Sequence, residues 1–220
     1  MSCGVHLDQS LDMMEETRFK RKHIKLIKKL SKELHFTYTE MEQILLIYYK
    51  IQKRGIEKAP GITKVQLREV LHTAFDMTDV ELTNDVVMSM VRGPSPYVPM
   101  NKFARIIALL LKGTLEEKIN HCFEVYDVML KGLIGKDIVV RFLGNSIIGI
   151  EEDSDDAVKD LVDTIMKKID LDRDLKISFG DYKTTVLKEP LLMECMGQCL
   201  PSRTAVHNVL TTMFPKPPKM

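Results

Sequence analysis

Apolar residues recur at every third or fourth position along most of the chain, and this spacing predicts short amphipathic helices. Strand-type alternation is almost absent, so the pattern indicates an all-α fold. The predicted helices cover residues 18–34, 41–49, 67–75, 78–91, 103–110, 119–126 and 158–169, with a short one after Ser178. Most begin with the Ser/Thr-x-x-Glu/Gln/Asp pattern of a capped helix start. These pairs are Thr39–Glu42, Thr63–Gln66, Thr78–Glu81, Thr114–Glu117 and Ser178–Asp181.

The connection over residues 170–181, Asp-Leu-Asp-Arg-Asp-Leu-Lys-Ile-Ser-Phe-Gly-Asp, has the ligand spacing of an EF-hand loop. The candidate metal ligands are Asp170, Asp172 and Asp174 at loop positions 1, 3 and 5, the backbone carbonyl of Lys176 at position 7, and Asp181 at position 12. Oxygens at these positions wrap a hard cation such as Ca²⁺ or Mg²⁺. Helical runs before and after the loop complete a helix–loop–helix unit.

Two residues of this loop depart from the EF-hand pattern. Leu175 stands at position 6, where the chain turns with positive φ and glycine is usual; a side chain costs about 1–2 kcal/mol in that conformation. Asp181 is one methylene shorter than the glutamate that supplies two oxygens at position 12. We therefore expect weak binding of Ca²⁺ or Mg²⁺, at one site at most.

An apolar residue at loop position 8 repeats along the chain. With Ile177 as the reference, the equivalent residues are Ile62, Val98 and Ile134, at spacings of 36, 36 and 43 residues. The longer last interval contains the acidic segment 151–156. Position 8 is where paired EF-hand loops form a short two-stranded contact, so the repeat predicts four units in two pairs.

The other three loops lack most of the ligands. At positions 1, 3, 5 and 12, loop 55–66 has Gly55, Glu57, Ala59 and Gln66, loop 91–102 has Val91, Gly93, Ser95 and Lys102, and loop 127–138 has Asp127, Met129, Lys131 and Ile138. Each loop supplies at most one carboxylate at these positions, whereas Ca²⁺ takes six to eight oxygens. We expect none of them to bind Ca²⁺.

Residues 17–32 carry eight Lys or Arg and no acidic residue, although the net charge of the chain is only +1. Apolar residues at positions 24, 27, 30 and 34 share one face, so residues 18–34 are predicted to form a basic amphipathic helix. Two interpretations stand. The helix binds an acidic surface, a membrane or an acidic protein, or it packs on its own domain with its lysines in solvent.

The sequence offers no signature of an enzyme or of a membrane protein. It has no nucleophile elbow, Gly-rich phosphate loop or HExxH motif, and its six histidines lie apart. The cysteines at 3, 122, 195 and 199 form no CxxC pair, which favours reduced thiols in a cytoplasmic protein. No apolar run is long enough to span a bilayer, and Met1-Ser2 lacks the glycine that N-myristoylation requires. We expect no membrane anchor and no nucleic-acid partner; the oligomeric state stays open.

Several segments resemble the calaxin family, ciliary EF-hand proteins related to the neuronal calcium sensors. The segments are Leu71-His-Thr-Ala-Phe-Asp-Met-Thr-Asp79, Lys112-Gly-Thr-Leu-Glu-Glu-Lys118, Cys122-Phe-Glu-Val-Tyr-Asp127, Lys159-Asp-Leu-Val162, Lys167-Lys-Ile-Asp170, Ile177-Ser-Phe-Gly-Asp-Tyr182 and Cys199-Leu-Pro201. In that family the second, third and fourth loops carry metal ligands. This chain departs from the family pattern in its second and third loops and keeps a weakened fourth.

The resemblance implies four EF-hand units in two paired lobes. The expected parts are a basic helical extension (1–38), an N-terminal lobe (39–112), a C-terminal lobe (113–190) and a short helical tail (191–220). It also implies a location in the axoneme of a cilium or flagellum, at outer-arm dynein. The implied partners are the dynein docking complex or other axonemal helices, with tubulin as a candidate for the basic helix.

Because most metal ligands are missing, we expect a non-catalytic adaptor that keeps the EF-hand scaffold as a helix-binding platform, with weak or lost calcium sensing. The alternative is a calcium-sensing regulatory subunit that acts through the fourth loop. A third interpretation, a membrane-recruited sensor, would depend on residues 18–34 alone.

Overall fold

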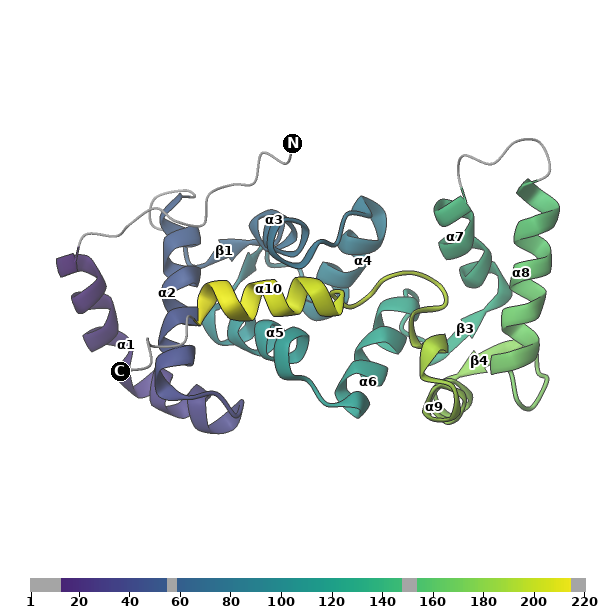
Figure 1. Cartoon of the computed structure of the whole chain (residues 1–220). Helices are drawn as coiled ribbons and strands as arrows, with labels where there is room; N and C mark the ends of the chain where they lie inside the picture. Colours follow the sequence, from purple (N-terminus) through teal and green to yellow (C-terminus); the bar gives the residue numbers. More distant parts are fainter. Residues whose placement is uncertain (1–12, 55–58, 148–153, 215–220) are drawn as a thin grey trace. The chain divides into compact units, whose positions relative to one another are not determined.

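The computed structural model describes residues 13–54, 59–147 and 154–214 (Figure 1). This part of the chain folds into α1 Met13–Glu33, α2 Tyr38–Arg54, β1 Ile62–Thr63, α3 Lys64–Phe75, α4 Val80–Met90, β2 Tyr97–Val98, α5 Met100–Lys112, α6 Leu115–Tyr126, β3 Leu133–Gly135, α7 Lys136–Ile147, α8 Ser154–Ile169, β4 Lys176–Ser178, α9 Phe179–Lys188, the 3₁₀ helix η1 Pro190–Glu194, and α10 Arg203–Met213. Helices dominate and the strands are very short, so the all-α prediction is confirmed. No helix in these ranges is long and apolar enough to cross a bilayer.

The short strands pair at the loop positions that the repeat predicts. In one sheet β1 runs antiparallel to β2, with Ile62 opposite Val98. In the other, β3 runs antiparallel to β4, with Ile134 opposite Ile177. All four side chains are fully buried, because each two-stranded contact lies over the apolar core of its own pair of loops. The predicted pairing of the four units is confirmed.

The chain divides into two compact units. The first comprises residues 1–78, 91–113 and 201–220, and the second comprises residues 79–90 and 114–200. The chain passes from the first unit to the second after residue 113, near the predicted boundary between the two lobes. Two helices belong to a different unit from their neighbours in the sequence. The helix α4 is part of the second unit, and α10 is part of the first. Within the second unit α4 packs on α6, and Asp85 of α4 forms a 2.7 Å ion pair with Arg141 of α7.

Capping hydrogen bonds confirm three of the predicted helix starts, at Thr63, Thr114 and Ser178. The start predicted at Thr78–Glu81 is wrong, because the carboxylate of Asp79 accepts the hydrogen bond from the Leu82 amide at 3.0 Å. Asp79 follows Thr78 directly in the chain, and its side chain caps the first turn of α4.

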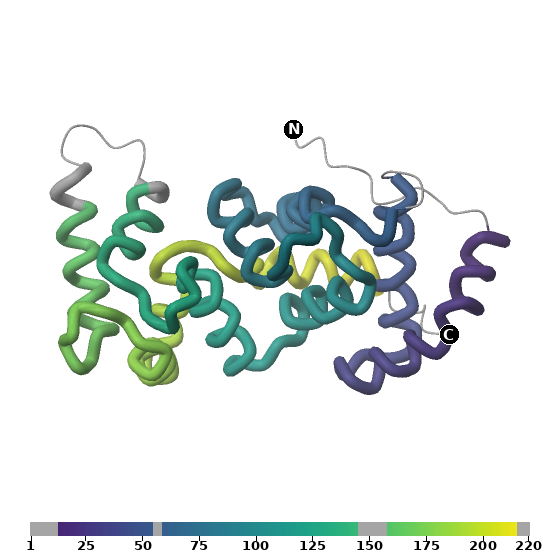
Figure 2. The backbone as a smooth tube through the Cα atoms, turned by 180° about the vertical axis from the view of Figure 1, so that it is seen from behind, coloured from purple at the N-terminus to yellow at the C-terminus, as the bar shows by residue number. Residues whose placement is uncertain are grey.

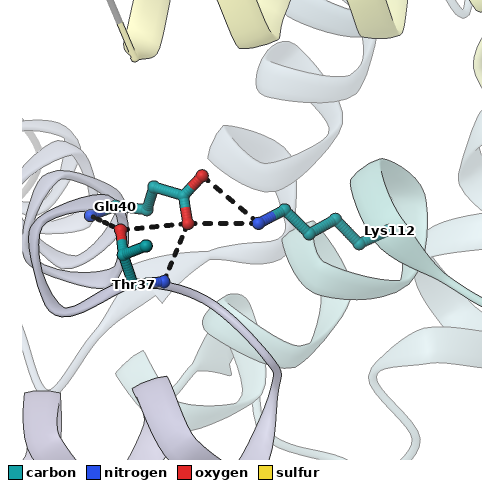
Figure 3. Close-up of polar contacts among 3 residues, drawn as sticks. All are labelled: Thr37, Glu40 and Lys112. Carbon is teal, nitrogen blue, oxygen red and sulfur yellow. Dashed lines mark hydrogen bonds and ion pairs between the residues drawn. The ribbon is translucent and has the colours of Figure 1, made fainter.

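The start predicted at Thr39–Glu42 is also wrong, because α2 begins two residues earlier. Thr37 and Glu40 form its capping pair: the Thr37 amide donates to Glu40 at 2.8 Å, and the Glu40 amide donates to the Thr37 hydroxyl at 3.2 Å (Figure 3). Phe36 and Met41, both buried, occupy the two positions of a hydrophobic staple around this start. Lys112 of α5 reaches the same carboxylate at 3.1 Å, which ties α2 to α5.

The first unit includes both ends of the described chain. Its α1 packs against α2 (Figures 1 and 2). The ring of Phe19 in α1 stacks on that of Tyr49 in α2 at a centroid distance of 4.7 Å. Its α10, drawn in yellow in Figure 1, packs against α2, α3 and α5 through Ala205 and Val209, which are both buried. The C-terminal helix therefore covers part of the apolar surface of the N-terminal EF-hand helices.

Candidate metal site

Three of the predicted ligands gather in the fourth loop. The loop begins directly after α8 and leads through β4 into α9, so a helix on each side holds its ends. One carboxylate oxygen from each of Asp170, Asp172 and Asp174 lies within 4.8 Å of the others. Since calcium–oxygen distances are about 2.3–2.6 Å, oxygens this close together fit around one cation. Asp170 is buried and the other two are exposed.

The first aspartate also shapes the loop through hydrogen bonds to the backbone. Asp170 accepts from the amides of Arg173 at 2.8 Å and of Leu175 at 2.9 Å. Further along, Asp174 accepts from the Lys176 amide at 2.8 Å. The carboxylates are therefore part of the folded turn as well as candidate ligands.

The loop makes the EF-hand turn even though glycine is missing from position 6. Arg173 and Leu175 have φ of 62° and 67°, in the left-handed region that disfavours L side chains. The Leu175 side chain is 72% exposed, so it meets no packed neighbour that would add to this cost. The folded loop thus contains the backbone strain expected from Leu175.

The position-12 residue has a different partner from the other carboxylates. Asp181 accepts from the hydroxyl of Ser178 at 2.5 Å and from its amide at 3.2 Å, which closes the capping box of α9. Asp181 is not a member of the group formed by the three earlier aspartates. Lys176 lies in β4, opposite Gly135 of β3. The structure therefore brings together the side chains of three of the four candidate aspartates and gives Asp181 a capping role.

The electrostatics of the site reflect crowded negative charge. The amide of Asp174 donates a hydrogen bond that lowers the pKa of Asp172, but desolvation, the charges of Asp174 and Asp181, and a hydrogen bond with Asp170 outweigh it and raise the pKa. A bound cation would relieve this repulsion, which is the electrostatic setting of a hard-cation site.

The third loop shows the same backbone without the ligands. Leu130 and Gly132 have φ of 54° and 72°, matching the left-handed positions of the fourth loop. Asp127 accepts from the amides of Lys131 at 2.9 Å and Gly132 at 2.7 Å. Met129 stands at a ligand position with 60% of its surface exposed. Asp127 therefore organises a turn, a role indicated in the sequence only by an aspartate at position 1 with glycine at position 6.

The remaining loops add no acidic group within the described ranges, where residues 170, 172 and 174 are the one set of three or more potential ligands. In loop 91–102, Val91 is buried and Lys102 is exposed. Gly55 and Glu57 of loop 55–66, and residues 151–153 of the acidic segment, lie outside the described residues.

Comparison with known proteins identifies the family. No protein-family model matches the chain. Calaxin of Danio rerio is 34% identical over 191 residues, which cover 83% of this chain and 91% of the relative. Calaxin of Homo sapiens is 33% identical over 189 residues, with 83% and 89% covered. The chain belongs to the calaxin family.

A more distant relative is guanylyl cyclase-activating protein 1 of Lithobates pipiens, 25% identical over 114 residues, or 51% of this chain and 55% of that protein. This calaxin-family chain is thus an EF-hand protein of a calcium-binding class whose relatives are regulatory proteins. The fourth loop differs from the usual EF-hand pattern at two positions, which carry Leu175 and Asp181.

A buried histidine near the second unit's cysteines is a feature that sequence reasoning missed. His121 Nε2 lies 3.2 Å from the Cys199 carbonyl oxygen and donates to it, because a carbonyl can only accept. Burial lowers the pKa of His121 to about 4, although the bond to Cys199 opposes the shift. In the described part of the chain Cys122, Cys195 and Cys199 are free thiols. The histidine is neutral at physiological pH and anchors the segment that follows η1.

Proposed function

We propose that this protein is a non-catalytic EF-hand adaptor of the ciliary or flagellar axoneme, associated with outer-arm dynein or its docking complex, in which calcium sensing is weak or lost. The observation that supports the loss of calcium sensing is the role of the residue at loop position 12, Asp181. Asp181 caps α9 through Ser178 and leaves Asp170, Asp172 and Asp174 as the clustered ligands.

Three clustered carboxylates fall short of a strong calcium site. Ca²⁺ takes six to eight oxygens, and in EF-hands a bidentate glutamate supplies two of them. Asp181 has the shorter side chain, and the paired loop offers Asp127 alone, already hydrogen-bonded to its own backbone. The site suits weak binding of Ca²⁺ or of the smaller Mg²⁺, with the Lys176 carbonyl and water completing the shell.

A platform role is supported by the retained EF-hand scaffold. Both strand pairs are intact, and α3, α6 and α9 each begin with a capping box. EF-hand lobes bind partner helices in a groove lined by Met and aromatic side chains. Among the candidates for such a lining, Phe179 is half-buried and Met88 is 51% exposed, whereas the others are buried in the cores: Met90, Phe103, Phe123 and Phe142. In the first unit α10 already lies on α2, α3 and α5, so a partner helix there would have to replace it.

The dynein docking complex, other axonemal helices and tubulin are proposed as partners on the strength of family membership. The absence of catalytic motifs supports a role without catalysis. Localisation of the endogenous protein is the direct test. We expect staining along axonemes and co-purification with outer-arm dynein components. Staining confined to the cell body would contradict the axonemal role.

One observation favours the alternative of a calcium-sensing regulatory subunit. The fourth loop keeps the EF-hand turn, and its three carboxylate oxygens lie within 4.8 Å of one another. Calorimetry of the full chain with CaCl₂, at physiological Mg²⁺, separates the two functions. We expect weak or no Ca²⁺ binding. A dissociation constant below micromolar would support the sensor instead.

A further inference from the structure

The helix α1 presents a continuous stripe of positive charge. Its members are the exposed side chains of Arg18, Arg21, Lys22, Lys25, Lys28, Lys29 and Lys32, here called the basic stripe. Steps of three and four residues place them on one side of the helix. From Arg18 to Lys32 the stripe is about 21 Å long, at a rise of about 1.5 Å per residue.

The opposite side of α1 is occupied by its own unit. Phe19, Ile27 and Leu30 are buried, with 5%, 0% and 1% of their surface exposed. Both sequence interpretations of this segment are therefore compatible. Its apolar face packs on α2, and its lysines face solvent, where they are free to meet a partner.

Each acidic residue of α1 forms its ion pair with a basic residue outside the stripe. Glu15 pairs with Lys53 at 2.5 Å, Glu16 with Lys20 at 2.6 Å, and Glu33 with Arg105 at 2.6 Å. Lys20 is not part of the stripe. Among the described residues no member of the basic stripe forms an ion pair, although the charge of Glu33 is close enough to Lys29 to interact with it. Seven like charges therefore lie along one face of α1.

We propose that the basic stripe is a docking surface for an acidic polypeptide segment, a run of glutamate or aspartate in a partner protein. An extended chain advances about 3.3–3.6 Å per residue, so a run of about six acidic residues matches the length of the stripe. The spacing between acidic side chains of the bound segment is then similar to the spacing between basic side chains of the stripe. This inference adds a binding surface to the proposed adaptor role. It rests on that role only for the place in the cell where the partner is bound.

Two other polyanions fit less well. Binding of an amphipathic helix to an anionic membrane uses an apolar face inserted among the lipids. In α1 that face is buried, and Ile24, 42% exposed, is the one large apolar side chain left exposed between Arg18 and Lys32. Nucleic-acid-binding domains commonly have pI values above about 9, whereas this chain has a sequence pI of 7.7.

The test measures binding of the full chain to a labelled oligoglutamate peptide by fluorescence anisotropy at low salt. An oligoglutamine peptide of equal length serves as the uncharged probe. We expect saturable binding of oligoglutamate alone, weakening steadily as salt is added. The simultaneous changes Lys25→Gln, Lys28→Gln, Lys29→Gln and Lys32→Gln should weaken binding about tenfold or more, because they remove four contacts from one line.

A matched variant separates the stripe from net charge. The changes Lys102→Gln, Lys131→Gln, Lys167→Gln and Lys188→Gln remove the same charge from exposed lysines outside α1. This variant should bind like the original chain. Replacing the four stripe lysines by arginine should also preserve binding, and circular dichroism of all variants checks that the helices persist.

Three outcomes would overturn the proposal. One is no binding of oligoglutamate by the original chain at low salt. Another is an equal loss in both glutamine variants, which would mean a general charge effect. The third is tighter binding to phosphatidylserine vesicles or to duplex DNA than to the peptide. None of these depends on where the protein resides, so failure here is distinguishable from failure of the axonemal localisation.

Discussion

Asp127 holds the turn of the third loop, although the other ligand positions of that loop carry no carboxylate. Its two carboxylate oxygens hold the amides of Lys131 and Gly132, and it is buried. Asp127→Ala should lower the free energy of unfolding by about 2–4 kcal/mol, because two hydrogen bonds to a charged group are lost. Urea denaturation in the presence of EDTA measures this free energy of unfolding. The exposed Asp160→Ala is the control and should be nearly neutral. An Asp127 variant as stable as the original would mean that the turn forms without this carboxylate.

The defects of the fourth loop are expected to be repairable. Leu175→Gly removes a left-handed leucine, a strain of about 1–2 kcal/mol that the gain in chain entropy partly offsets. Asp181→Glu adds the reach for bidentate coordination and should favour Ca²⁺ over Mg²⁺. We expect calorimetry to show tighter Ca²⁺ binding by the double variant, by about tenfold. The control is Leu130→Gly in the third loop, which has the same left-handed φ and no ligand cluster. If the double variant gains no affinity, the fourth loop does not bind through these positions.

The buried His121 makes the second unit sensitive to acid. Its folded pKa of about 4 lies below the ordinary value of 6.5, so the unfolded chain takes up the proton first. Its effect on stability is therefore absent above pH 6.5 and grows unfavourable as pH falls toward 4. The difference amounts to about 3 kcal/mol. His121→Gln should remove this part of the acid-induced loss in urea titrations, whereas His207→Gln, at an exposed position, should retain it. Equal acid sensitivity in the His121 variant and the original chain would contradict the assignment.

At the scale of elements, α10 is expected to stabilise the first unit. Val209 of α10 is buried within that unit, while its neighbour Asn208 is exposed. Val209→Asp should lower the free energy of unfolding by about 3 kcal/mol, because a charge would be buried without a partner. Asn208→Asp places the same charge one residue away in solvent and should change little. Equal stability of the two variants in thermal unfolding would show that α10 does not need its contacts with α2, α3 and α5.

At the scale of the molecule, calcium should act on one unit only. The clustered carboxylates lie in the second unit, and the described loops of the first unit have no such group. A ligand without differential affinity for two conformations cannot shift them. Micromolar Ca²⁺ should therefore leave amide chemical shifts across residues 39–78 and 91–111 unchanged. EDTA-treated protein gives the reference spectrum. Shifts spread through the first unit would show that calcium reaches it.

Local sequence information predicted much of this fold because the features concerned are local. Amphipathic helices, capping pairs and loop ligands lie within a few residues of one another, so spacing alone reveals them. The apolar residue at position 8 is one step less local, yet its repeat still marks the pairing of Ile62 with Val98 and of Ile134 with Ile177. Where two cap residues competed, as at Thr37 and Thr39, spacing did not decide between them.

By itself, then, the sequence determined that the chain is an all-α EF-hand protein with one partly intact loop, since ligand identity and helical periodicity are written in residue order. Only the tertiary structure decided that α4 belongs with α6 and that α10 covers α2, α3 and α5. It also decided that the acidic residues of α1 pair away from its basic stripe. Such contacts join residues far apart in the chain, and which of many possible partners a side chain meets depends on how all the helices pack together.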